Sequence, residues 1–419
     1  MAAKWSVLTY IAAHNNLELL GTVSRKQILD VGSTADVVHG MLYDGSVGAA
    51  RYVVGNSGKV RTQDPLGALN SGDPDALIET AKWFFGQNPA ERYGLVLWSH
   101  GTGWEPNQIA EVAQEARPAA ARDDDEAKER AIAPGSLALF RSTLRQLLTP
   151  ARQTERAILF DDGTGQSIDT LELERVGREI MAAIGHPLEL LGMDACLMGN
   201  LEVAYQMRNT VRHLVASPEL VPGHSWPYTT IYGDLKNDPN QDGATLARTV
   251  VSRYVEFYVA NPPRTGDVTK VALDLGRIDP LKNAADGLAK ALLEDIERSS
   301  AALWAAQEST QERENPKKTR KPSKFDYHLW DLGSVAAALG QSNDASTSVK
   351  DAARDTAAAL EPGAGAVIAE GHRGAWFDSS FGVSIYLPVL KRISPWYPQV
   401  AFAADTEWDE MLVAYRSSI

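Results

Sequence analysis

The sequence contains a single cysteine, Cys196, among its 419 residues, so no disulfide can form within the chain. It has no run of about 18 apolar residues, which excludes a conventional membrane-spanning helix. The amino terminus, MAAKWSVLTYIAAHNN, lacks the basic start and long apolar core of a signal peptide. From these absences we expect a soluble, cytoplasmic protein that neither spans nor binds a membrane.

Basic residues are also in short supply, with 41 Lys and Arg against 54 Asp and Glu and a net charge of −13. This balance argues against a general nucleic-acid binder and fits basic substrates or partners. The composition, 44% hydrophobic and 23% charged, is that of a globular protein. The length predicts either one large α/β domain with additions or two domains.

Short apolar runs alternate with helical patterns along most of the chain. Strand, helix, strand in this order predicts a parallel sheet covered by helices on both faces. The predicted strands are 5–13, 50–55, 93–98, 157–160, 188–193, 211–217, 268–274 and 382–388. The predicted helices are 17–31, 35–41, 73–85, 170–184, 246–258, 281–308 and 405–415.

Two segments interrupt this pattern. Residues 105–156 are rich in Ala, Arg, Asp and Glu, and we interpret them as an exposed insertion in a catalytic region that covers 1–260. Residues 311–324 (QERENPKKTRKPSK) have almost no apolar side chains, which predicts a mobile basic loop in a carboxyl-terminal region, 261–419, packed on the same core. No aromatic residues accompany the basic ones there, so a nucleic-acid arm is disfavoured.

The stretch LELLGMDACLMGNL, residues 188–201, combines a buried strand with the only cysteine. Helical spacing resumes after Cys196, which predicts a helix whose amino terminus would lower the pKa of the thiol. A nucleophile at the carboxyl end of a strand lies on the rim of an α/β sheet. The alternative is a buried, inert cysteine.

A histidine follows another strand in the same way, in YGLVLWSHGTGW at 93–104. The carboxyl ends of parallel strands share one edge of a sheet, so His100 and Cys196 can reach one cleft, where an imidazole would take the proton of a thiol. Gly101 allows the backbone to approach a substrate carbonyl, and we assign the oxyanion donors to the N–H groups of Gly101 and Cys196. No G-x-S-x-G elbow is present, which excludes a typical serine hydrolase.

These two motifs resemble the histidine and cysteine motifs of the clostripain family of cysteine peptidases. Most of the chain shares the resemblance, including WSVLTYIAAHNNLE, FDDGTGQSIDTLELERV, VASPELVPGHSWPYTTI, FGVSIYLP and WDEMLVAY. The resemblance implies a caspase-like fold, a three-layer α/β/α sandwich with a mostly parallel central sheet, here with an additional carboxyl-terminal region.

By the same resemblance His100 and Cys196 form a catalytic dyad, and Asp194 lines the primary specificity pocket. A carboxylate two residues before the nucleophile would pair best with Arg and less well with Lys. The alternative is that Asp194 caps the helix expected near Cys196. We assign Ser217 and Glu219 to a wall of the pocket. The predicted activity is endopeptidase cleavage after Arg, or after Lys, through a thioester; the competing hypothesis is a catalytically idle interaction scaffold.

The sequence departs from the caspase pattern in one spacing. The separation between His100 and Cys196 is nearly twice the roughly 50 residues of caspase-type chains, and the surplus lies in 105–156. Arg117, Arg122 and Arg130 would be cleavable there, so self-processing is a working hypothesis. An intracellular protease of this kind must be held as a zymogen or controlled by an activating or inhibiting protein partner.

We expect no cofactor and no catalytic metal. Calcium remains an alternative, because Asp123–Asp125, or Asp161 and Asp162, offer carboxylate ligands. No EF-hand spacing accompanies them, and acidic loops are usually only solvated. A further departure is His14, where the relatives usually carry an acidic residue.

Overall fold

The structure is a computed structural model of the 419-residue chain that describes residues 2–104, 158–161, 164–263, 267–310, 328–363, 365–388 and 393–418. The predicted insertion at 105–156 and the predicted basic loop at 311–324 therefore lie outside the described residues. Within the described residues, no helix is both long enough and apolar enough to cross a bilayer.

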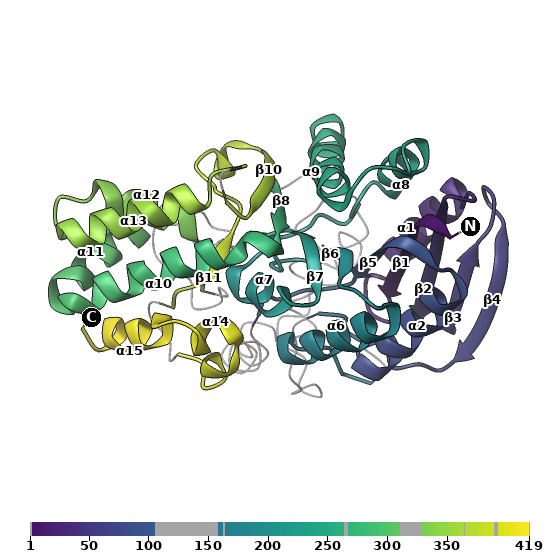
Figure 1. Cartoon of the computed structure of the whole chain (residues 1–419), viewed down its shortest axis with the longest axis horizontal. Coiled ribbons are helices and arrows are strands. Elements are labelled where there is room, and N and C mark those ends of the chain that lie inside the picture. The colour runs from purple at the N-terminus through teal and green to yellow at the C-terminus, as the bar shows by residue number, and fades with distance from the viewer. Residues whose placement is uncertain are drawn as a thin grey trace, which may run out of the picture.

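The centre of the fold is a nine-stranded sheet with the strand order β10-β8-β7-β6-β5-β1-β2-β3-β4 (Figure 1). The five strands from β7 to β2 are parallel to one another, and the strands outside them run antiparallel to their neighbours. The bounds are β1 Ala3–Ala12, β2 Val37–Gly45, β3 Gly48–Val54, β4 Val60–Gly67, β5 Ala90–Trp98, β6 Leu188–Asp194, β7 Val211–Ala216, β8 Val268–Asp274 and β10 Val367–Arg373. This confirms the expected α/β class with a largely parallel sheet.

Helices cover both faces of this sheet, and β2 shows how alternate residues divide between them. The ring of His39 stacks on Tyr232 of α8 at 4.4 Å, whereas a side chain at Gly40 would collide with Phe84 of α2. Figure 1 accordingly shows α8 and α9 above the sheet and α2 and α6 below it. The bounds are α1 Glu18–Val31, α2 Pro74–Gln87, α6 Thr170–Ile184, α7 Leu201–Met207, α8 Tyr228–Asn237 and α9 Gly243–Ala260.

Local sequence signals explain where two of these helices begin. Asp73 caps α2 by accepting a hydrogen bond from the Asp75 N–H at 2.8 Å, and Pro74 occupies the first turn, where its missing N–H costs nothing. Asp169 and Glu172 form a reciprocal capping box at the start of α6. These helix starts were predictable because capping is a local property.

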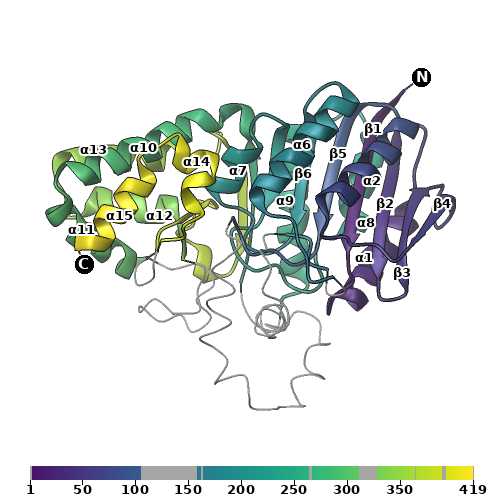
Figure 2. The same cartoon turned by 90° about the horizontal axis from the view of Figure 1, so that it is seen from below.

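A helical layer extends the molecule at the end opposite β4 (Figure 2). It is joined to the core through the buried side chain of Glu202 on α7, which accepts hydrogen bonds from the Tyr386 N–H at 2.9 Å and the Tyr397 hydroxyl at 3.0 Å. Its elements are α10 Ile278–Glu294, α11 Ile296–Ser309, α12 Leu332–Gln341, α13 Thr347–Ala359, α14 Ala401–Ala404, α15 Trp408–Ser418, β9 Leu329–Asp331 and β11 Ser384–Tyr386, with the short helices η1 Leu275–Arg277, η2 Ala375–Phe377 and η3 Tyr397–Gln399.

Three predicted elements are wrong. The predicted helix at 35–41 is strand β2, because pairing with β1 outweighs the local helical pattern. The predicted strand at 157–160 is reduced to isolated antiparallel bridges of Ile158 with Gly101 and Ile168. The predicted long helix at 281–308 is two helices, α10 and α11, which meet at Asp295.

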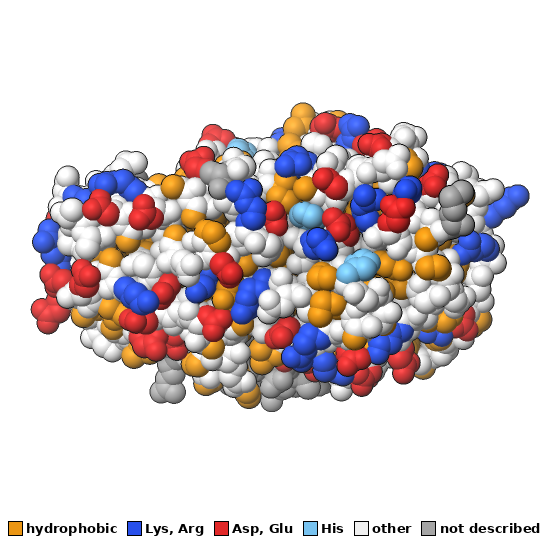
Figure 3. Space-filling view, in the orientation of Figure 1, with side chains coloured by type: hydrophobic (Ala, Val, Ile, Leu, Met, Phe, Trp, Pro, Cys, Tyr) orange, Lys and Arg blue, Asp and Glu red, His pale blue; other side chains and the backbone are white. Residues whose placement is uncertain are grey.

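Acidic and basic side chains alternate over the face of the molecule that Figure 3 shows. That face carries no extended patch of a single sign. It offers no electrostatic footprint of the kind that binds a nucleic-acid backbone.

Candidate active site

The register between β5 and β6 determines where the two predicted reactive side chains lie. The strands are parallel neighbours, and Trp98, the last residue of β5, pairs with Asp194, the last residue of β6. His100 and Cys196 each come two residues after this pair, at equivalent positions beyond the same edge of the sheet. Neighbouring strands lie about 4.8 Å apart, so the structure brings the two residues together at one edge.

The turns that carry these residues touch at Gly101. A β-carbon at this position would come within 2.5 Å of the Cys196 carbonyl oxygen and 2.9 Å of the Ala195 β-carbon. Only glycine fits such a close approach without moving one of the two turns. The backbone of the histidine turn therefore lies directly against the backbone of the cysteine turn.

The imidazole of His100 is completely buried and held from two sides. Its Nε2 is 2.7 Å from Oδ1 of Asn16, in the turn after β1, and the ring of Phe160 meets it edge-on at 5.9 Å. An amide oxygen accepts a proton, so this bond favours the tautomer with the proton on Nε2. In that tautomer Nδ1 carries no proton and is the basic nitrogen of the ring.

The thiol of Cys196 is buried too, with 2% of the residue exposed. Its Sγ accepts a hydrogen bond from the Val221 N–H at 3.3 Å. Burial raises the pKa of Cys196 to about 12; the Val221 N–H and Lys270 oppose this rise, whereas Glu219 adds to it. In this conformation the sulfur is therefore a protonated thiol.

The prediction that a helix begins near Cys196 is wrong. Helix α7 begins at Leu201, capped by the Asn200 side chain, which accepts a hydrogen bond from the Val203 N–H at 2.9 Å. Leu197 has a positive φ of 64°, so the chain turns sharply directly after the cysteine. Helix α7 therefore begins too late for its amino terminus to lower the pKa of Cys196.

Asp194 is buried behind the cysteine and is bound by the loop that follows β7. Its Oδ2 accepts hydrogen bonds from the Ser225 hydroxyl, from the Trp226 N–H at 3.1 Å and from the Tyr228 hydroxyl at 2.9 Å. Burial raises the pKa of Asp194, and these bonds limit the rise. The carboxylate does not cap α7, because Asn200 does.

Ser217 and Glu219 are buried in the same loop, where they form hydrogen bonds that hold the backbone. The Ser217 hydroxyl donates to the Thr269 carbonyl at 2.9 Å, and the Ser217 carbonyl accepts from the Gly199 N–H at 2.8 Å. The Glu219 carbonyl accepts from the Leu197 N–H at 3.2 Å. These bonds hold the turn after Cys196, and the role of both residues as a pocket wall stays a prediction.

Sequence reasoning missed four residues that the structure adds to this region: Asn16, Ser225, Tyr228 and Lys270. Ser225 and Tyr228 belong to the loop motif that was singled out, but the loop alone does not say which of its groups turn toward Asp194. Lys270 had a signal that could have been used. It is the only basic residue within the apolar strand VTKVALD, and it is fully buried.

A cluster of His14, Asp44 and Asp161 could hold a cation. Nδ1 of His14 lies 3.1 Å from Asp161, and with Asp44 these side chains place ligand atoms within 4.8 Å of one another. Burial raises the pKa of Asp44 to about 6. The calcium alternative thus keeps Asp161 as a candidate ligand, whereas Asp123–Asp125 and Asp162 lie outside the described residues.

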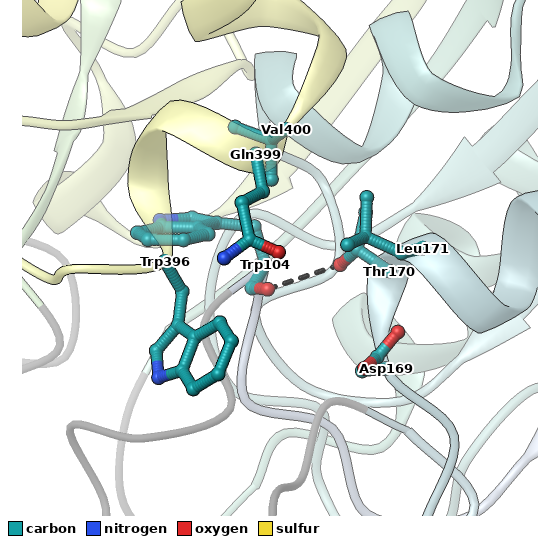
Figure 4. A pocket seen from close by; sticks show the side chains of 7 residues that line it. All are labelled: Trp104, Asp169, Thr170, Leu171, Trp396, Gln399 and Val400. Atoms are coloured by element: carbon teal, nitrogen blue, oxygen red, sulfur yellow. Dashed lines mark hydrogen bonds between the residues drawn. The ribbon is translucent and has the colours of Figure 1, made fainter.

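A surface pocket lies apart from the dyad, between the start of α6 and the segment before α14 (Figure 4). The Thr170 hydroxyl donates to the Trp104 carbonyl across it at 3.0 Å, and the Trp104 ring packs edge-on against Tyr386. The pocket therefore marks where the chain after the histidine motif is anchored. Its lining residues are Trp104, Asp169, Thr170, Leu171, Trp396, Gln399 and Val400.

With this geometry in hand, comparison with known proteins is informative. Residues 147–415 match the sequence model of the clostripain family, peptidase C11. The chain belongs to the clostripain family. As a member of that family it is a cysteine peptidase, and the family resemblance drawn from its two motifs is confirmed. No curated protein matches the sequence.

Solved structures of C11 proteases resemble this clostripain-family chain in fold. A secreted C11 cysteine protease from Bacteroides thetaiotaomicron, bound to an irreversible peptide inhibitor, is 19% identical with a TM-score of 0.61, covering 97% of this chain and 100% of that one. A second secreted C11 cysteine protease from that organism, iotapain, is 15% identical with a TM-score of 0.64, and the match covers 97% of this chain and 99% of that one. An inactive zymogen C11 protease from Parabacteroides distasonis is 16% identical with a TM-score of 0.60, and the match covers 97% of this chain and 99% of that one.

Proposed function

We propose that the chain is an endopeptidase that cleaves after Arg, and less efficiently after Lys, through a dyad of His100 and Cys196. The observation that carries the proposal is the Trp98–Asp194 register, which gives the imidazole and the thiol equivalent positions beyond adjacent parallel strands. The close approach of Gly101 to the Cys196 backbone supports it further. Family membership supplies the reaction type, hydrolysis of a peptide bond by a cysteine.

In the acylation step, Nδ1 of His100 takes the proton of the Cys196 thiol while the sulfur attacks the carbonyl carbon of the scissile bond. A thiol with a pKa of about 12 needs such a base, because almost no thiolate exists beforehand at neutral pH. The oxyanion that develops is stabilised by the N–H groups of Gly101 and Cys196. The imidazolium then protonates the leaving amine, the C–N bond breaks, and an acyl thioester remains on the sulfur.

Deacylation reverses the proton transfers. His100 takes a proton from a water molecule, whose oxygen attacks the thioester carbonyl. The second tetrahedral intermediate collapses with cleavage of the C–S bond, and the imidazolium returns its proton to the sulfur. The carboxylic acid product leaves, and the thiol is restored. Asn16 keeps the imidazole in the required tautomer, because its Oδ1 accepts a hydrogen bond from the Nε2–H group.

Specificity in this proposal comes from Asp194. Its Oδ2 accepts three hydrogen bonds from protein donors, whereas its buried Oδ1 has no hydrogen-bond partner among the residues that the structure describes. A buried carboxylate oxygen of this kind is costly unless it is bound. A guanidinium group of the substrate would supply the missing donor and a compensating charge.

The buried dyad supports a second part of the proposal, that the intact chain is latent and is activated by cleavage or by a protein partner. The His100 imidazole is fully buried and Cys196 is 2% exposed, so a peptide has no direct route to the sulfur in this conformation. Arg117, Arg122 and Arg130 are the cleavage sites we propose for self-processing. A related C11 protease has been solved as an inactive zymogen.

We also propose an intracellular location. The two Bacteroides thetaiotaomicron structures are described as secreted proteases. Fractionation of the native organism with an antibody against this chain would decide between the two locations. Recovery from the cytosol would support the proposal, and recovery from the medium would contradict it.

A catalytically idle scaffold is the alternative function. The discriminating experiment is a panel of fluorogenic peptides that differ only in the residue before the scissile bond, assayed with wild type and Cys196→Ala. We expect cleavage after Arg, weaker cleavage after Lys, and none by the variant. Equal cleavage after Asp and Arg would contradict the role of Asp194, and no cleavage by wild type in either its intact or its processed form would favour the scaffold.

A further inference from the structure

Lys270, in the middle of β8, is a fully buried cation without a hydrogen bond or ion pair among the described residues. Its Nζ lies 4.1 Å from the ring centre of Tyr254 and 5.4 Å from that of Trp226. Contacts with aromatic faces stabilise an ammonium only partly, and burying one without a carboxylate partner is costly. A side chain held in this way calls for an explanation beyond packing.

The surroundings of Lys270 are those of the proposed specificity pocket. Asp194 and Cys196 are the two charged or ionisable groups whose fields act most on the ammonium. Trp226, whose ring faces Lys270, also donates its backbone N–H to Asp194 at 3.1 Å. The ammonium therefore lies in the same buried region as the carboxylate proposed to read the substrate.

Polar atoms without partners gather in this region. Four atoms are buried without a hydrogen bond to any part of the chain that the structure describes: Nζ of Lys270, Oδ1 of Asp194, Nε1 of Trp226 and the hydroxyl of Tyr254. About nine in ten buried polar groups in proteins are satisfied. The Lys270 ammonium faces the rings of Tyr254 and Trp226, and Trp226 is hydrogen-bonded to Asp194, so these unsatisfied atoms belong to neighbouring side chains.

Lys270 is directed to this place by the strands around it. It pairs with Gly371 of β10, and a β-carbon at Gly371 would meet Val255 at 2.9 Å and Val251 at 3.0 Å, both on α9. That face also carries Tyr254 of α9, which is neutral because burial raises its pKa. Of the charged residues of β10, Glu370 and His372 pair with Val271 and Thr269 and lie on the opposite face. Arg373 pairs with Val268 on the face of Lys270, at the end of the strand, where its guanidinium lies 3.9 Å from the Asp267 carboxylate.

We propose that Lys270 is a specificity-determining residue, whose ammonium holds the place of the substrate cation at Asp194, so that Arg binds productively only when Lys270 is uncharged. The inference deepens the proposed function and rests on it. At neutral pH the charges of Asp194 and Lys270 compensate each other, so the preference for Arg is expected to be weaker than Asp194 alone would give.

The physical basis is repulsion between two cations in a site with little water. A guanidinium that enters beside Asp194 would lie close to the ammonium of Lys270, and one of the two must lose its charge or leave. Arg keeps its proton in proteins, whereas Lys gives it up readily when buried. Burial lowers the pKa of Lys270 to about 8, with Asp194 opposing the shift, so the side chain is mostly charged at neutral pH and neutral above it.

The expected effect on binding can be stated as a fold-change. If only the neutral form accepts Arg, the competent fraction rises about thirtyfold between about pH 6.5 and about pH 9 for a group that titrates near 8. A substrate with citrulline, the neutral counterpart of Arg, meets no such repulsion. The ratio of kcat/KM for the Arg substrate to kcat/KM for the citrulline substrate isolates this effect, because titration of the dyad cancels.

The test measures this ratio against pH for the active protein, for Lys270→Met and for Lys290→Met, an exposed control on α10. We expect the ratio to rise with pH in wild type and in the control. In Lys270→Met it should be high and independent of pH, and the thermal unfolding midpoint should be unchanged or raised, because the substitution removes a buried charge without a carboxylate contact.

Two failures can be told apart. The role of Lys270 would be overturned, while cleavage after Arg stands, if the ratio in wild type does not change with pH; this measurement needs no variant. The same conclusion follows if wild type and Lys270→Met give the same ratio at every pH. If no protein cleaves the Arg substrate faster than Cys196→Ala does, the proposed function itself fails and this inference falls with it.

Discussion

Gly101 and Cys196 are in backbone contact, and a β-carbon on the glycine would come within 2.5 Å of the cysteine carbonyl oxygen. The contact joins the turn after β5 to the turn after β6. It makes the relative position of His100 and Cys196 a property of the backbone rather than of flexible side chains. Misplacement by about 1 Å in such a constellation costs about 100-fold in rate.

Gly101→Ala should therefore lower kcat by about 100-fold, because the added methyl group forces the two turns apart. Gly233 on α8, where a β-carbon meets nothing within 4 Å, offers a matched control. We expect Gly233→Ala to retain activity. Steady-state kinetics with an Arg substrate would measure both, and near-normal kcat in Gly101→Ala would contradict the role of this contact.

Asp194→Asn should lower kcat/KM for Arg substrates by at least about 100-fold, since the amide keeps the shape of the pocket but loses the charge that pairs with a guanidinium. Alkylation of Cys196 should be at least as fast as in wild type, because the variant keeps the thiol and removes a charge that raises its pKa. Kinetics on an Arg peptide, with mass spectrometry of the alkylated protein, provide both readouts. A variant that still prefers Arg would assign recognition to another residue.

The thiol of the intact chain should react unusually slowly. A pKa of about 12 leaves roughly a thousandfold less thiolate near pH 8 than an ordinary cysteine with a pKa near 9 has. His100→Ala, which cannot process itself in our account, keeps the chain intact for this measurement. Iodoacetamide labelling followed by intact mass should be slow in the native protein and fast in denaturant. Equally fast labelling in both conditions would show that the site is open.

Glu202 predicts a pH dependence of stability. Burial raises its pKa from 4.5 to about 7, so the folded state holds the proton more tightly than the unfolded state does. The resulting stabilisation is complete below about pH 4.5 and is lost as the pH rises through 7. Glu202→Gln in a Cys196→Ala background keeps an oxygen to accept from the Tyr386 N–H and should remove this loss.

The measurement is the thermal unfolding midpoint of the two proteins between pH 5 and pH 8. Relative to its parent, Glu202→Gln should gain stability as the pH rises. A constant difference between the two proteins across this range would mean that Glu202 does not titrate there.

The sequence was sufficient for elements whose signals are local. Capping residues mark the starts of helices α2 and α6, and apolar runs mark strands β5 and β6, which end two residues before His100 and Cys196. The prediction of a helix in place of strand β2 is wrong, because the strand is stabilised by pairing with β1, a segment about 30 residues away that a local pattern does not report. The same limit explains why β8 could be predicted as a strand but not as an antiparallel neighbour of β7.

Within the site, the sequence pointed to the residues that follow strands but not to those that surround them. Asn16 reaches His100 from the turn after β1, and Lys270 reaches the Asp194 region from β8. Both contacts join segments far apart in the chain, so no local spacing encodes them. The pKa of Cys196 was expected to fall and instead rises, because the structure buries the thiol and starts α7 later than the sequence suggested.

The most direct test of the central claim is covalent labelling by a peptidyl Arg chloromethyl ketone, read by intact mass and peptide mapping of the full chain and its processed form. The account predicts one label on Cys196 of each processed chain, far less label on the full chain, no label in His100→Ala, and far less label with the Asp counterpart of the reagent. Equal labelling by the Arg and Asp reagents, or labelling of Cys196 that does not require His100, would contradict it.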